Sequence, residues 1–198
     1  RGRAALNVKL SKEKFQRHPY EPCYLYESGI RPLEQYPVRG VIWYQGESNA
    51  HNCEAHEKLF KLLVGSWRKN WKNEDLPFYY VQLSSIARPS WPWFRDSQRR
   101  MMAEIPNTGM AVSSDYGDSL DVHPRNKKPV GERLGRWALN KTYGYTSLVP
   151  SGPLFRKAEF RDWEVLITFD YGEGMRSSDN GPIRAFEVAE VEGLYYPA

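Results

Sequence analysis

Two short polar clusters in this chain carry side chains that could perform acid–base and anion-stabilising chemistry. The first cluster, Gln45-Gly46-Glu47, follows an apolar run at Val38–Tyr44. The second contains His123, with Asp121 two residues before it. A histidine oriented by a carboxylate is a natural general base for a serine hydroxyl. A side-chain amide beside a glycine N–H can stabilise an oxyanion. The two clusters therefore predict a base and an anion site.

The elements around these clusters predict an α/β fold. Three apolar runs are predicted as strands, the first of them buried on both faces: Val38–Tyr44, Pro77–Leu83 and Thr108–Ser113. Residues 1–37 have no clear period and are predicted as loop with one short helix near Leu25–Leu33. Segments with helical spacing lie between and after the strands: Asn52–Trp71, Phe94–Ile105 and Pro129–Tyr143. This alternation indicates a parallel sheet with right-handed crossovers. Because sites in such sheets form at the carboxyl ends of the strands, the two clusters are expected at one rim.

The same spacing predicts the buried face of each helix. In the first long helix the expected stripe is Ala55, Leu59, Leu62, Leu63, Trp67 and Trp71. In the second it is Phe94, Gln98, Met101, Met102 and Ile105. In the third it is Val130, Leu134, Trp137 and Ala138.

The pattern changes after Pro150. Glu164–Asp170 alternates with period two, which is typical of an antiparallel strand, and Gly and Pro punctuate the rest of the chain. We predict a boundary near Val149–Pro153. Residues 1–149 then form the α/β domain, and residues 150–198 begin a β-rich accessory region.

Composition narrows the class of protein. The chain has 198 residues, 40% of them hydrophobic, which suffices for one substantial core. The formal net charge is +4, in short runs typical of solvated faces, so a nucleic-acid partner is not expected. No hydrophobic run approaches the roughly 20 residues of a membrane span. Cys23 and Cys53 form no metal-type pair, and their redox state is left open. The chain has seven Trp and 13 Tyr, and this aromatic content weakly favours a sugar ligand.

Several segments resemble one known family. The string Gly40–Ala50 resembles a block of the sialate O-acetylesterases, within the SGNH (GDSL-type) hydrolases. Pro106–Val112 and Asp121–Lys127 are similar to that family's strand and histidine block, and the similarity runs along nearly the whole chain. The resemblance implies a three-layer α/β/α sandwich with a parallel sheet, here partial. It also implies a periplasmic or secreted location, which the sequence itself leaves open.

The resemblance assigns roles to the two clusters. It implies that Gln45 and Gly46 form part of the oxyanion hole and that His123 is the base. The general SGNH pattern has an Asp three residues before the histidine, where this chain has Leu120. The acid that orients His123 is therefore either Glu47, which we favour slightly, or Asp121. Arg95 is a further candidate for meeting a substrate carboxylate, although a solvent-exposed helix position fits it equally well.

The family's serine nucleophile has no counterpart here. Gly117–Leu120 spells GDSL, but it lies just before His123 rather than after a first strand, so we interpret Ser119 as a coincidence. The family's Gly-Gln-Ser-Asn-like block belongs upstream of Trp43, and nothing before Gly40 supplies it. We therefore expect a fragment whose N-terminal part, with the serine, lies elsewhere. The chain alone is expected to be inactive.

The predicted function is that of a carbohydrate O-acetylesterase using a serine–histidine–acid mechanism on O-acetyl esters of sialic acids. Neither a cofactor nor a metal is expected. Two alternatives remain open at this point. One is an acetylesterase for xylan or another plant glycan, and the other is a non-catalytic sugar-binding module. Oligomeric state is not predicted.

Overall fold

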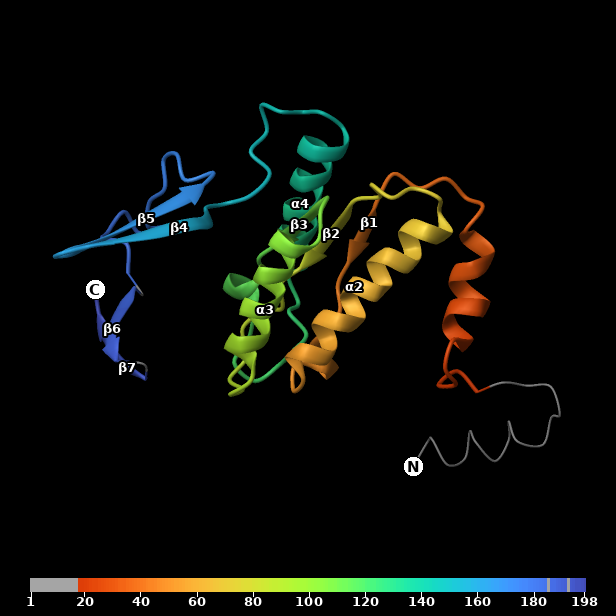
Figure 1. Cartoon of the computed structure of the whole chain (residues 1–198), viewed down its shortest axis with the longest axis horizontal. Helices are drawn as coiled ribbons and strands as arrows, with labels where there is room; N and C mark the ends of the chain where they lie inside the picture. The colour runs from red at the N-terminus through yellow and green to blue at the C-terminus, as the bar shows by residue number, and fades with distance from the viewer. Residues whose placement is uncertain (1–17, 185, 192) are drawn as a thin grey trace.

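A parallel sheet of three strands forms the centre of the protein (Figure 1). In this computed structural model, residues 18–184, 186–191 and 193–198 are described. The strands are β1 (Val41–Trp43), β2 (Phe78–Val81) and β3 (Thr108–Ala111), in spatial order β1-β2-β3. Both neighbouring pairs run parallel, which confirms the predicted α/β class.

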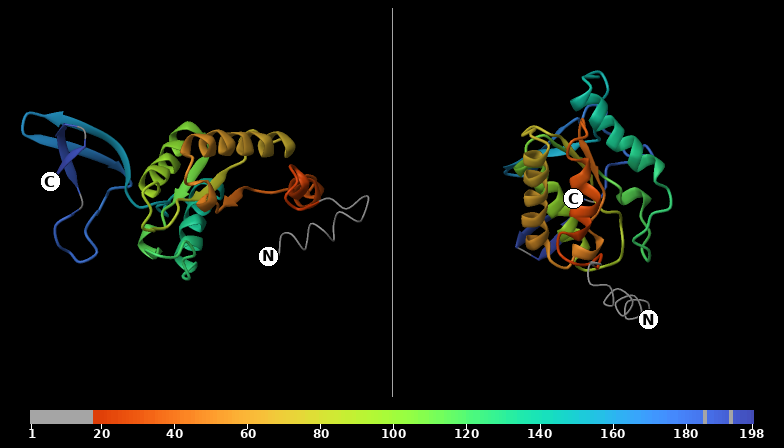
Figure 2. Two further views of the ribbon diagram at one scale, coloured as in Figure 1. Left: turned by 90° about the horizontal axis from the view of Figure 1, so that it is seen from below. Right: turned by 90° about the vertical axis from the view of Figure 1, so that its right-hand side faces the viewer.

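Helices cover both faces of this sheet (Figure 2). On one face lie α2 (Cys53–Asn70) and α3 (Trp91–Glu104), and on the other lies α4 (Lys128–Trp137), which continues as the π-helical turn η5 (Ala138–Thr142). Asn52 Oδ1 caps α2 by accepting the N–H of Ala55 at 3.0 Å. The predicted three-layer α/β/α arrangement is therefore confirmed.

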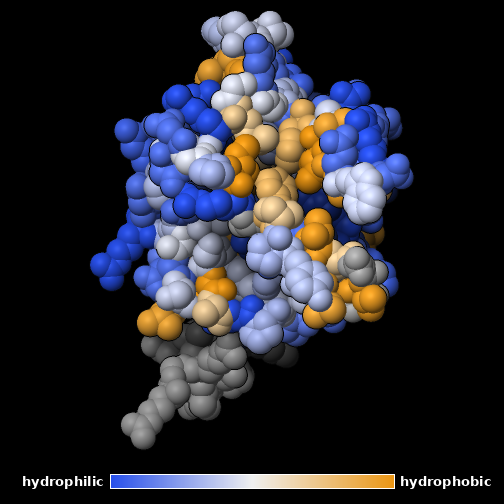
Figure 3. All heavy atoms as spheres, turned by 90° about the vertical axis from the view of Figure 1, so that its left-hand side faces the viewer, coloured by the Kyte–Doolittle hydropathy of each residue, from blue (hydrophilic) through white to orange (hydrophobic). Residues whose placement is uncertain are grey.

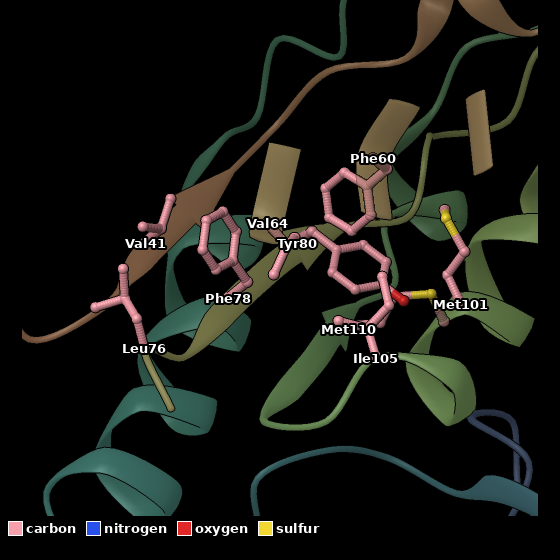
Figure 4. Close-up of a cluster of buried hydrophobic side chains, with 9 residues drawn as sticks. All are labelled: Val41, Phe60, Val64, Leu76, Phe78, Tyr80, Met101, Ile105 and Met110. Carbon is pink, nitrogen blue, oxygen red and sulfur yellow. The ribbon is translucent and has the colours of Figure 1, made fainter. Parts of the chain in front are cut away.

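The core is organised by the alternation of side chains along β2. Phe78 and Tyr80 face α2 and α3, while Tyr79 and Val81 face α4. All four are at most 4% exposed, so this central strand is buried on both faces. The first set belongs to the cluster drawn in Figure 4: Val41, Phe60, Val64, Leu76, Phe78, Tyr80, Met101, Ile105 and Met110.

The structure corrects the prediction for the first strand. β1 spans only Val41–Trp43 rather than Val38–Tyr44, and it lies at an edge of the sheet. Ile42 is 68% exposed, so the expected burial on both faces is wrong. The reason is that α4 packs on β2 and β3, which leaves the α4 side of β1 without cover.

The buried stripe of α2 also differs from the prediction. Leu59 and Leu62 are 59% and 68% exposed, whereas His56, Phe60 and Val64 are buried. The helix α2 carries apolar side chains on several of its sides. Only the side that packs on the sheet and on α3 is buried. In α3 and α4 the predicted faces are confirmed for the following buried residues: Phe94, Gln98, Met101, Ile105, Val130, Leu134 and Trp137.

The remaining elements are short. Where a helix near Leu25–Leu33 was expected, the structure has the π-helical turn η1 (Tyr26–Ile30) and the 3₁₀ turn η2 (Arg31–Leu33). Other 3₁₀ turns are η3 (Glu47–Asn49) and η4 (Ser114–Tyr116). None of the helices in the described ranges is long and apolar enough to cross a membrane.

Two antiparallel hairpins follow the α/β unit. They are formed by β4 (Leu154–Arg161) with β5 (Glu164–Asp170), and by β6 (Glu187–Val191) with β7 (Leu194–Pro197). β5 has the predicted bounds. Figure 3 views the molecule from the side where the hairpins lie and shows hydrophobic residues at its surface. In the first hairpin, the side chains of Phe160 and Trp163 are 82% and 98% exposed. The domain boundary near Val149–Pro153 stays a prediction.

The contact between Gly109 and Trp137 gives a test of the packing between β3 and α4. A Cβ at Gly109 would lie 2.4 Å from Trp137 Cδ2, so Gly109→Ala should lower the free energy of unfolding by about 1–3 kcal/mol through overpacking. Urea-induced unfolding measures the change. The matched control is Gly135→Ala in α4, where nothing lies within 4 Å of the added Cβ. That variant should be neutral or stabilised by up to about 1 kcal/mol. Equal losses in both variants would contradict the packing described.

Candidate active site

The loop after β1 is fixed by a close contact at Gly46. Its φ is 149°, and an added Cβ would lie 2.9 Å from Phe94 Cε1 and 3.5 Å from Leu83 Cδ1. The N–H of Asn49 donates to the carbonyl of Gly46 at 2.8 Å, which closes the turn η3. Glycine is therefore required both by the backbone conformation and by the space available.

This turn presents two polar side chains beside the rim of the sheet. Gln45 and Glu47 are both half-buried. Neither side chain makes a hydrogen bond or ion pair with any residue that the structure describes. A partly buried amide and carboxylate without protein partners are free to bind a ligand.

The second loop places an exposed imidazole beside a carboxylate. His123 Nδ1 lies 2.9 Å from Asp121 Oδ1, and the backbone N–H of His123 donates to the same oxygen at 2.9 Å. Both hydrogen bonds lower the pKa of Asp121 below its usual range, and the one from the backbone N–H has the larger effect. A carboxylate at Nδ1 fixes the tautomer that leaves Nε2 able to accept a proton. The imidazole side chain itself is 83% exposed.

Contacts between the two loops place them at the same rim. Lys127 Nζ lies 4.6 Å from the centre of the Tyr44 ring and 3.5 Å from its hydroxyl. Val122 packs on a buried cluster that includes Ala50 and Leu83. The residues flanking Gln45-Gly46-Glu47 and those flanking His123 therefore share packing partners at the carboxyl ends of the strands.

The two candidate acids differ in their relation to the histidine ring. Asp121 meets the ring of His123 at 2.9 Å. No hydrogen bond in the described part of the chain joins Glu47 to His123. The orienting role of either carboxylate stays a prediction. The sequence slightly favoured Glu47, whereas the geometry favours Asp121.

Ser119 and Arg95 are held by local contacts. The carbonyl of Ser119 accepts the N–H of Ala87 at 3.0 Å, in an exposed loop that follows β3. Arg95, on α3, places Nη2 3.4 Å from Gln82 Oε1, and desolvation lowers its pKa. Neither residue is brought into contact with His123 by a described interaction, so their roles remain predictions.

A cavity of about 530 Å³ lies elsewhere, along β3, α4 and the segment before β4. Its lining includes Arg133, which makes hydrogen bonds of 2.7 and 2.6 Å with the two carboxylate oxygens of Asp115. None of the residues of the two polar clusters lines it. Within the described ranges, no group of three or more His, Cys, Asp or Glu side chains could hold a metal ion.

Sequence reasoning missed two residues that support this rim. Lys127 ends the Asp121–Lys127 block, but its contact with Tyr44 was not predicted. His56 is buried on α2 and lies beside Asn49. A usable signal for His56 was its position four residues before Phe60, on the same face of the helix.

Comparisons with known proteins identify the family and the fold. The family described as "carbohydrate esterase, sialic acid-specific acetylesterase" matches residues 11–140. The sialate O-acetylesterase of Rattus norvegicus is 31% identical over 83% of this chain and 34% of its own length. The human sialate O-acetylesterase is 31% identical over 86% of this chain and 37% of its own length. A solved carbohydrate acetylesterase from Xanthomonas citri has a TM-score of 0.78 and 35% identity, covering 87% of this chain and 42% of that one.

The lengths in these comparisons matter for the site. The matched part spans about a third of each curated relative.

The contact at Gly46 generates a prediction. Gly46→Ala should lower the free energy of unfolding by about 2–4 kcal/mol, because a Cβ strains the backbone and overlaps Phe94. Chemical denaturation of Gly46→Ala, Phe94→Leu and the double variant measures the coupling. Since the smaller side chain removes the overlap, the double variant should lose less than the sum of the single variants. Strict additivity would show that Phe94 does not set the constraint.

Proposed function

The chain belongs to the family of sialic acid-specific carbohydrate acetylesterases, and on this premise we propose that it forms part of the active site of a carbohydrate O-acetylesterase. The proposed substrates are O-acetyl esters of sialic acids. The observation that carries the proposal is the shared rim, where Tyr44 contacts Lys127 and the unpartnered Gln45 and Glu47 lie on the same loop as Tyr44.

In the proposed reaction, a serine hydroxyl attacks the acetyl carbonyl carbon. His123 Nε2 takes the hydroxyl proton, and Asp121 at Nδ1 stabilises the imidazolium that forms. The side-chain amide of Gln45 and the N–H of Gly46 donate to the oxygen that becomes negative. Collapse of this tetrahedral intermediate releases the sugar hydroxyl, which takes the proton from His123, and leaves an acetylated serine. Water then attacks with the same base and releases acetate.

The serine of this mechanism is proposed to come from sequence outside these 198 residues. We give Ser119 no catalytic role, because Gly117–Leu120 lies just before His123 and not after a first strand. On this proposal the chain alone binds the acetylated sugar weakly and releases no acetate.

The first test measures acetate release from O-acetylated sialic acid by the protein expressed with its natural flanking sequence. His123→Ala should lower kcat by at least about 10³-fold, because the general base is lost. The matched control is Ser119→Ala, which should retain full turnover. Full activity in the His123 variant would refute the assignment of the base, and loss in the Ser119 variant would show that Gly117–Leu120 is no coincidence.

The same assay separates the two acids and the alternative functions. Asp121→Asn should lower kcat more than Glu47→Gln, because Asp121 contacts Nδ1 of His123. The reverse order would return the orienting role to Glu47. Faster release from acetylated xylan would move the substrate to a plant glycan. Saccharide binding without turnover would support a sugar-binding module instead.

A further inference from the structure

A buried histidine lies directly beneath the loop that bears Gln45 and Gly46. His56, on the first turn of α2, is 4% exposed. Its Nδ1 lies 3.2 Å from Nδ2 of Asn49, the residue that ends the turn η3. The backbone N–H of Asn49 is bonded to the carbonyl of Gly46 at 2.8 Å. Asn49 therefore connects the histidine to the turn through its side chain and its main chain.

The surroundings of His56 hold its ring in one place. The ring stacks on Phe60 with centroids 6.1 Å apart and lies 4.6 Å from the centroid of Phe94. Phe94 is the same side chain that limits the space at Gly46. The histidine, the phenylalanine and the glycine thus form a continuous layer from α2 to the loop.

The hydrogen bond to Asn49 requires a neutral imidazole. The amide Nδ2 is a donor, so Nδ1 of His56 must be the acceptor and Nε2 carries the proton. Desolvation lowers the pKa of His56, against the smaller opposing effect of the neighbouring Glu57. Burial thus keeps the ring in the state that can accept from Asn49.

We propose that His56 is a positioning residue of the acetylesterase site, which fixes the turn η3 and the adjoining Gln45 and Gly46 by accepting a hydrogen bond from Asn49. The inference rests on the proposed function, because it concerns how accurately Gln45 and Gly46 are aimed at the developing oxyanion. Such donors are effective only when they are held where the charge appears. Removing the acceptor leaves a partly buried amide unpaired and lets the turn adopt other conformations.

The first experiment measures hydrogen exchange of the Asn49 backbone amide in the 198-residue chain. Two variants are compared, His56→Leu and His56→Asn. The Asn and Leu side chains are similar in shape, and only Asn keeps an acceptor close to the position of Nδ1. Both variants lose the ring contacts equally. His56→Leu should exchange this amide at least about fivefold faster than His56→Asn, while the amide of Tyr80 in β2 should not distinguish the two variants. Equal rates at Asn49 in the two variants would overturn the proposal.

The second experiment measures kcat and KM for acetate release by the protein with its natural flanking sequence. His56→Leu should lower kcat about tenfold with KM unchanged, and His56→Asn should recover most of the loss. Adding Asn49→Ala to His56→Leu should cause no further loss, since both changes break one hydrogen bond. Equal kcat in the two His56 variants would overturn the catalytic part of the proposal. A wild-type protein that releases no acetate would count against the proposed function, and the exchange rates would still decide whether His56 fixes the turn.

Discussion

The contact of Phe94 with Gly46 is the constraint on which the proposed site depends. Phe94 is fully buried at the start of α3, and it meets the loop after β1 at a position that has room only for glycine. The same ring packs on His56 of α2 and belongs to the cluster that receives Val122. The side chain of Phe94 therefore links α2, α3, the loop that bears Gln45 and the loop that bears His123.

The sheet provides a rigid base for this contact through its central strand. Where β2 ends, Gln98 of α3 accepts from the N–H of Leu83 at 2.9 Å and donates to the carbonyl of Val81 at 3.2 Å. A buried side chain therefore replaces the ladder partners that the main chain loses as it leaves the sheet. Leu83 then joins Phe94 beneath Gly46. The hydrogen bonds of Gln98 thus fix the end of β2, and the ring of Phe94 packs between that end and Gly46.

The order of elements was predictable because it depends on local patterns. The helical spacing of Val130, Leu134 and Trp137 predicted the buried face of α4, and the alternation at Glu164–Asp170 predicted β5 with its observed bounds. The exposure of Ile42 was not predictable, because it depends on which strands α4 covers. The exposure of Leu62 likewise depends on which side of α2 meets the sheet. Apolar character alone does not distinguish covered positions from uncovered ones.

For the candidate site, the sequence by itself determined which chemical groups are present: an amide and a carboxylate beside a glycine, and an imidazole two residues after Asp121. The tertiary structure decided that the loops bearing them meet at one rim, through Tyr44 with Lys127 and through Val122. It also decided that Asp121 contacts the ring of His123 and that His56 supports Asn49. Residue types are fixed by the chain, but contacts between distant segments exist only once a shared core brings them together.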